Sequence, residues 1–120
     1  MKKTADLRTW PIVHVYAQFE EHDSLLIVGT RTGIDALRAA LEQAWKASCL
    51  EDAGYAEAQL TVNDGEGYEC YVIAYDDAAV IERAVQPYAG YDFDRMQANS
   101  ATPLLHEHEL LRMARREATR

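Results

Sequence analysis

Two stretches near the start of the chain have the hydrophobic pattern of β-strands. Residues 11–19 alternate between apolar and polar positions, with Val13 on one face and His14 on the other. A period of two is typical of a half-buried strand. Residues 24–29 are apolar on both faces, which predicts a central strand. The short polar segment 20–23 between them predicts a hairpin.

A helix is predicted over residues 31–47, directly after the second strand. Thr32 and Asp35 have the spacing of a capping box, with Asp in the place of the usual Glu. Apolar side chains recur at three- and four-residue intervals, so they form one stripe that we expect to be buried. The members of this stripe are Ile34, Leu37, Leu41, Ala44 and Trp45.

The pattern of the first hairpin returns after the helix. Residues 56–62 alternate again and residues 68–75 form a second apolar run. The sequence Asn-Asp-Gly-Glu-Gly at 63–67 lies between them, and Asn and Gly tolerate the positive φ of tight turns. These residues predict a second antiparallel hairpin.

The remainder of the chain is predicted to be partly helical. Residues 78–86 have the pattern of a short helix that Pro87 ends, and residues 87–100 are expected to be irregular. Thr102 before Pro103 is a typical helix start, which predicts a last helix over 103–117. Its expected buried residues are Leu104, Leu111 and Ala114, with Leu110 and Met113 alongside.

The predicted order of elements is strand, strand, helix, strand, strand, helix, helix, which belongs to the α+β class. We expect one four-stranded, mainly antiparallel sheet, covered on one face by the long helix, with a C-terminal helix in addition. A chain of 120 residues can bury a sizeable core without a disulfide or a metal. Residues 1–120 are therefore predicted to be a single domain, with loose ends at 1–9 and 117–120.

Composition narrows the environment in which the protein is expected to work. The chain has no apolar run of the kind found in signal peptides or transmembrane helices, so we expect a cytoplasmic protein. Cys49 and Cys70 do not form a Cys-x-x-Cys pair, which predicts free thiols in a reducing compartment. The net charge of −8 argues against nucleic-acid backbones and anionic membranes as partners.

Acidic residues are concentrated in the middle of the chain. Between residues 47 and 94 there are eleven acidic residues and one basic residue, Arg83, so this stretch has a net charge of −10. Seven aromatic residues lie in the same stretch. Aromatic side chains are favoured anchors at interfaces, and acidic residues around them would steer a basic partner. The predicted partner-binding residues are Asp64, Glu66, Tyr68, Glu69, Tyr71, Tyr75, Asp76, Asp77, Tyr91, Asp92 and Asp94.

The acidic stretch also has a simpler interpretation. Exposed carboxylates increase solubility in many proteins, and tyrosines commonly fill the space between strands. A further alternative is a small-molecule pocket, because His14 and Tyr16 share the polar face of the first strand and could meet Tyr71 across the sheet.

Motifs for catalysis and for metal or phosphate binding are absent from the sequence. No nucleophile elbow, Walker loop or Gly-x-Gly-x-x-Gly pattern is present, so we predict no catalytic residue and no cofactor. His106 and His108 are two residues apart, and on a helix this spacing would point their rings in opposite directions. We therefore predict no metal site there.

Part of the chain, about residues 24–75, resembles small immunity proteins of bacterial polymorphic-toxin systems. The resemblance depends on the strand Leu25-Leu26-Ile27-Val28-Gly29, the helix pattern Thr32-Gly33-Ile34-x-x-Leu37-x-x-x-Leu41 and the hairpin Asn63-Asp64-Gly65-Glu66-Gly67-Tyr68-Glu69. It implies a non-enzymatic inhibitor that binds a cognate toxin, and it transfers no catalytic residue. The expected function is thus a non-enzymatic binding protein for a basic partner. The alternative is a small-ligand-binding or regulatory domain that forms a homodimer and has its pocket near His14, Tyr16 and Tyr71.

Overall fold

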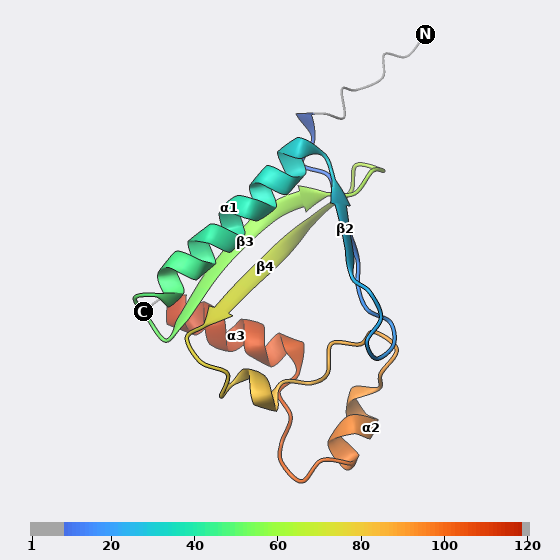
Figure 1. Ribbon diagram of the computed structural model, residues 1–120, viewed down its shortest axis with the longest axis vertical. Coiled ribbons are helices and arrows are strands. Elements are labelled where there is room, and N and C mark those ends of the chain that lie inside the picture. Colours follow the sequence, from blue (N-terminus) through green and yellow to red (C-terminus); the bar gives the residue numbers. More distant parts are fainter. Residues whose placement is uncertain (1–8, 119–120) are drawn as a thin grey trace.

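The computed structural model describes residues 9–118 and has an α+β architecture (Figure 1). The order of elements follows the predicted order, with one additional short helix before the last one. The elements are β1 (Val13–Tyr16), β2 (Leu26–Gly29), α1 (Arg31–Ser48), β3 (Ala53–Thr61), β4 (Gly67–Tyr75), a 3-10 helix (Ile81–Arg83), α2 (Phe93–Ala98) and α3 (Glu107–Ala118). Among the described residues, no helix has the length and apolar character that crossing a membrane requires.

The four strands form two separate two-stranded antiparallel sheets, β1–β2 and β3–β4. A parallel bridge between Ile12 and Thr61 joins the backbones of the two hairpins, which diverge from it (Figure 1). Because a Cβ on Gly29 or Gly33 would lie within 2.3 Å of the Ile12 carbonyl oxygen, the start of β1 is packed tightly against the beginning of α1. This packing holds β1 away from β3 beyond Ile12, so the predicted four-stranded sheet does not form.

The N-cap of helix α1 lies two residues before the predicted capping box. Thr30 is the N-cap, and its side-chain oxygen accepts a hydrogen bond from the Gly33 backbone N–H at 3.0 Å. The same hydroxyl donates to the Trp10 carbonyl at 2.6 Å, so one side chain joins the helix start to the segment before β1. The prediction of Thr32 as the cap was therefore wrong.

The core lies between α1 and one face of the β3–β4 sheet. Small side chains allow a close approach there, and a Cβ on Gly54 would lie 1.9 Å from the Ala44 carbonyl oxygen. The buried cluster consists of Val13, Leu37, Ala40, Ala44, Ala56, Ala58 and Leu60.

The buried stripe of α1 is rotated from the predicted one. Gly33, Leu37, Ala40, Ala44 and Ser48 face the sheet, which confirms two of the five predicted positions. Ile34, Leu41 and Trp45 are instead 40%, 51% and 62% exposed, because small residues let the helix lie closest to the strands on their side.

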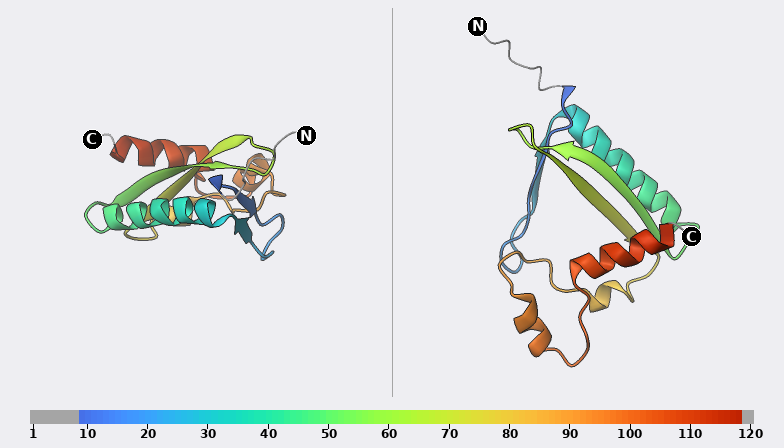
Figure 2. Two further views of the ribbon diagram at one scale, coloured as in Figure 1. Left: turned by 90° about the horizontal axis from the view of Figure 1, so that it is seen from above. Right: turned by 180° about the vertical axis from the view of Figure 1, so that it is seen from behind.

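Helix α3 lies on the opposite face of the β3–β4 sheet from α1 (Figure 2). Ala114 is buried as predicted, and the other predicted apolar side chains, Leu104, Leu110, Leu111 and Met113, are half-buried. The helix begins at Glu107 and not at 103, because Leu105 forms a parallel bridge with Ala84 and so remains extended.

Two predictions for the segment before α3 were wrong. The helix expected at 78–86 is reduced to the 3-10 turn Ile81–Arg83. The segment expected to be irregular contains α2, whose N-cap Asp92 accepts a hydrogen bond from the Asp94 backbone N–H at 2.9 Å.

The tip of the first hairpin is attached to the segment before α2. The backbone N–H groups of Ala89 and Gly90 donate to the carbonyls of Gln18 and Phe19 at 2.9 and 2.8 Å. The hairpin is therefore held at both ends, at its start by Ile12 and at its tip by residues 89–90, and the two hairpins and their connections form a closed outline (Figure 1).

Candidate functional site

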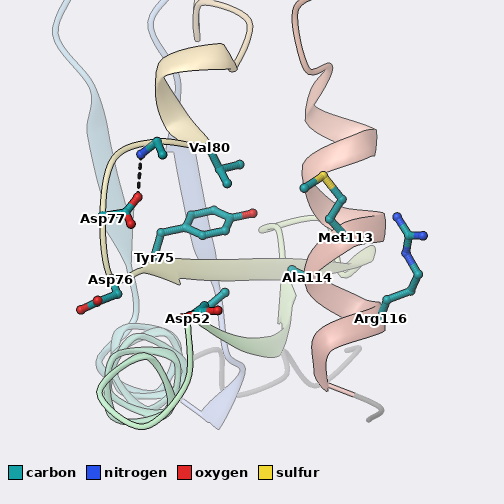
Figure 3. A pocket seen from close by; sticks show the side chains of 10 residues that line it. Asp52, Tyr75, Asp76, Asp77, Val80, Met113, Ala114 and Arg116 are labelled. Carbon is teal, nitrogen blue, oxygen red and sulfur yellow. Dashed lines mark hydrogen bonds between the residues drawn. The ribbon is translucent and has the colours of Figure 1, made fainter.

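A pocket of about 560 Å³ lies where the end of β4 meets α3 (Figure 3). The Tyr75 ring extends from the last residue of β4 toward α3, beside Val80 of the segment that follows the strand. Met113 and Ala114 of α3 form the apolar wall on the other side. The further lining residues are Asp52, Ala53, Asp76, Asp77, Ala79 and Arg116.

The Tyr75 hydroxyl is the unusual group of this pocket. It is buried, and it has no hydrogen-bond partner among the described residues. Burial raises the pKa of Tyr75 above its ordinary value, so the hydroxyl keeps its proton at neutral pH. A buried hydroxyl without a partner costs about 1–3 kcal/mol. The Tyr75 hydroxyl is therefore a polar group whose hydrogen-bonding capacity the described residues leave unused.

Carboxylates lie at the mouth of the pocket. Asp52, Asp76 and Asp77 are exposed there, and the Asp76 backbone N–H donates to the Asp52 carbonyl at 3.1 Å, which holds the two residues together. Asp77 accepts a hydrogen bond from the Ala79 backbone N–H at 2.7 Å, so its side chain is also oriented. Arg116 is the one basic residue among the described residues of the lining, so these residues carry more negative than positive charge.

Helix α3 is held over the sheet beside this pocket by Arg115. Its Nη2 donates to the Tyr71 hydroxyl at 2.7 Å and its Nε donates to the Tyr55 hydroxyl at 3.3 Å. Tyr71 donates in turn to Glu69, and this hydrogen bond is the main cause of the lowered pKa of the Glu69 carboxyl. Glu69 and Tyr71 therefore serve to anchor α3 on the sheet.

The structure places the predicted partner-binding residues in separate groups. Tyr75, Asp76 and Asp77 lie together at the pocket. Asp64 and Glu66 lie in the turn at the other end of the nine-residue strand β4, a distance of roughly 30 Å for a strand of that length. The third group, Tyr91, Asp92 and Asp94, lies next to the tip of the first hairpin, where the Tyr91 hydroxyl donates to Glu21 at 3.3 Å.

Tyr68 has a different environment from the other predicted residues. It faces α1, is half-buried, and its hydroxyl donates to the Val13 carbonyl at 2.5 Å. Its ring packs against the core cluster. Tyr68 thus joins the second hairpin to the first.

The residues of the alternative pocket are only partly brought together. His14 Nδ1 lies 3.0 Å from the Tyr16 hydroxyl, and His14 Nε2 accepts a hydrogen bond from the Asn63 backbone N–H at 3.1 Å. His14 and Tyr16 both line a depression of about 390 Å³ beside Tyr68. Tyr71 is not among its lining residues, since its hydroxyl contacts Arg115.

The histidines before α3 differ from the sequence-based expectation. His106 precedes the helix, so the argument from helical spacing does not apply, and the rings of His106 and His108 stack with centroids 4.8 Å apart. Ligand atoms of His106, Glu107 and His108 lie within 4.8 Å of one another. His106 Nδ1 already accepts a hydrogen bond from the His108 backbone N–H, which leaves Nε2 as its one remaining ligand atom.

Known proteins give no guide to the role of this pocket. No family model, no curated protein and no solved structure matches this chain.

Sequence reasoning missed part of the pocket lining. Asp52, Met113 and Arg116 come from the loop before β3 and from α3, and no local pattern relates them to Tyr75. The sequence alone showed that Tyr75 ends a predicted strand and that Asp76 and Asp77 follow it directly.

Proposed function

We propose that this protein is a non-enzymatic binding protein, of the class to which immunity-type inhibitors belong, that holds a basic protein partner. The Tyr75 pocket would receive a lysine or arginine side chain of that partner. The observation that carries the proposal is the buried Tyr75 hydroxyl, which lacks a partner and lies behind a mouth formed by three aspartates.

A basic side chain matches each chemical feature of this pocket. Its apolar stem would pack against Val80 and Met113, as long basic side chains do on apolar surfaces. Its charged end would be attracted by Asp52 and Asp76 at the mouth and, once inside, would donate to the Tyr75 hydroxyl oxygen. A cation close to the Tyr75 ring would be stabilised further by a cation–π interaction.

The overall charge of the protein supports the same partner. The net charge of −8 attracts a basic protein over long range, and acidic groups near a docking site increase the rate of encounter. The other acidic groups, at the β3–β4 turn and near α2, would contribute to this attraction without a direct contact.

The experiment is a titration of the protein with a lysine-rich peptide, and with any basic protein it captures, at low and high salt. We expect affinity to fall as salt rises, and the double variant Asp52→Asn/Asp76→Asn to lose about tenfold in affinity, or about 1.4 kcal/mol. The matched control is Glu20→Gln/Glu66→Gln, which removes the same charge away from the pocket. Equal losses in both variants would show that charge alone acts, and salt-independent binding would contradict the proposal.

The second candidate is a small-ligand-binding or regulatory domain. The observation that favours it is the depression beside His14 and Tyr16, where the imidazole is fixed by two hydrogen bonds. Ligand-induced changes in the NMR signals of His14, in the absence of any protein partner, would favour this candidate over the first.

A further inference from the structure

We infer that the first hairpin is an interface between two copies of this chain, which pair through their β2 strands in antiparallel orientation. This inference is independent of the proposed function, because the Tyr75 pocket is built from other elements.

The first hairpin exposes apolar side chains on both of its faces. The exposed side chains on or next to its strands, each 43–61% exposed, are Val15, Tyr16, Phe19, Leu25, Leu26, Ile27 and Val28. Pairing through β2 would bring the exposed side chains of Leu26 and Val28 against those of the second copy. A two-stranded hairpin is also marginal in water without further strands or packing.

One edge of β2 has no strand beside it in the described part of the chain. The Thr30 backbone N–H donates to the Ile12 carbonyl at 2.9 Å, so the even-numbered residues of β2 direct their N–H and C=O groups toward β1. Leu25, Ile27 and Gly29 direct theirs outward. These outward groups are available to a strand of another molecule.

Charge favours a second copy as that molecule. The segment from Ser24 to Gly29 contains no charged residue, so two chains of net charge −8 can approach there without opposing like charges. A basic partner would gain nothing from this neutral strand.

The register of such a pair follows from the outward groups. A two-fold pairing centred on Ile27 places Ile27 opposite itself and Leu25 opposite Gly29 of the second copy. Four strands then form one continuous sheet in which β2 is central, as its apolar sequence predicts.

The first experiment measures mass by light scattering and sedimentation, from about 1 µM to about 200 µM. We expect the wild-type mass to rise to twice 13.5 kDa. Ile27→Lys should raise the dissociation constant at least tenfold, and Leu50→Lys, which changes another exposed leucine off the hairpin, should leave it unchanged. A wild-type chain that stays monomeric throughout, or an Ile27→Lys chain that dimerises normally, would overturn the inference.

The second experiment tests the register without a destabilising charge. In a Cys49→Ser background, chains with Leu26→Cys and chains with Val28→Cys are oxidised separately and as a mixture. The register places Leu26 opposite Val28 of the other copy at about 4.5 Å between Cα atoms, which permits a disulfide. We expect efficient cross-linking in the mixture and little in either chain alone, and equal cross-linking in all three would exclude this pairing.

Discussion

Arg115 of α3 lies over the ring of Tyr71 of β4, with its guanidinium carbon 4.7 Å from the ring centroid. The same guanidinium donates hydrogen bonds to the hydroxyls of Tyr71 and Tyr55. Arg115 thus combines a cation–π contact with two directed hydrogen bonds, and its planar group suits both. It holds one end of α3 on the sheet.

Replacing Arg115 should therefore loosen α3 and lower the melting temperature. Arg115→Ala is expected to lower it more than Arg112→Ala, a change of the same size at an exposed position on the same helix. Because α3 forms one wall of the Tyr75 pocket, the Arg115 variant should also lose affinity for the basic partner. Thermal unfolding and the salt titration measure the two effects, and equal melting temperatures in both variants would contradict this role.

Removing the hydroxyl of Tyr75 and that of Tyr68 should change stability in opposite directions. The Tyr75 hydroxyl is buried without a partner, so Tyr75→Phe is expected to raise the free energy of unfolding by up to about 1 kcal/mol. The Tyr68 hydroxyl donates to the carbonyl of the fully buried Val13, so Tyr68→Phe is expected to lower it by about 1 kcal/mol. Urea denaturation measures both variants.

Tyr75→Phe also separates structure from binding. If the hydroxyl is kept for a partner, this variant should be more stable and bind more weakly. A variant that is both more stable and unchanged in affinity would show that the partner does not use the hydroxyl.

Stability should decrease in alkaline solution. Burial raises the pKa of Tyr68 and of Tyr75 in the folded state. Above about pH 10, the ordinary pKa of tyrosine, the unfolded chain loses its phenolic protons while the folded chain keeps them. The stabilisation is therefore complete below about pH 10 and is lost as pH rises through the folded-state pKa values.

The loss of stability in alkaline solution can be followed by urea denaturation at a series of pH values. Burial also raises the pKa of the Cys70 thiol, so some loss should begin below the tyrosine range. The double variant Tyr68→Phe/Tyr75→Phe should show a smaller loss above about pH 10. An unchanged slope in that variant would assign the loss to other groups.

The contact between α1 and β3 should not tolerate a larger residue at Gly54. A Cβ there would meet the Ala44 carbonyl oxygen at 1.9 Å and the Ser48 backbone nitrogen at 2.6 Å, and neither backbone atom can move without the helix. Gly54→Ala is expected to cost about 3 kcal/mol or more. Gly67→Ala, whose Cβ would have its nearest neighbour at 3.7 Å, is the matched control and should fold normally. Similar unfolding midpoints for the two variants would contradict the packing described here.

Local sequence patterns predicted the elements of this fold well. The alternating strands, the Asn-Asp-Gly-Glu-Gly turn and the long helix depend on interactions between near neighbours, and these dominate within a hairpin or a helix. The patterns did not predict how the hairpins meet, since that depends on the passage of Ile12 between Gly29 and Gly33. The same holds for α1, where apolar spacing alone could not tell the buried Ala40 from the exposed Trp45.

At the candidate site, too, the sequence predicted what neighbouring residues determine and missed what long-range packing determines. Tyr75 and the Asp76–Asp77 pair follow one another in sequence and were predicted together. Asp52 and Met113 reach the pocket through the pairing of Ala53 with Tyr75 and through the packing of α3, which are long-range effects. Asp92 illustrates a missed local signal, since Asp is a preferred N-cap residue and Asp94 adds the acidic side chain that is favoured in a first turn.

The attachment of Gly90 to Phe19 has a consequence for molecular recognition. A Cβ on residue 90 would lie 2.8 Å from the Phe19 carbonyl oxygen, so the tip of the first hairpin is closely fastened to the opposite arm of the molecule. An apolar hairpin fixed at both ends is already rigid before any encounter. Association through it would lose little conformational entropy, and such preorganisation gives tighter binding for the same contact area.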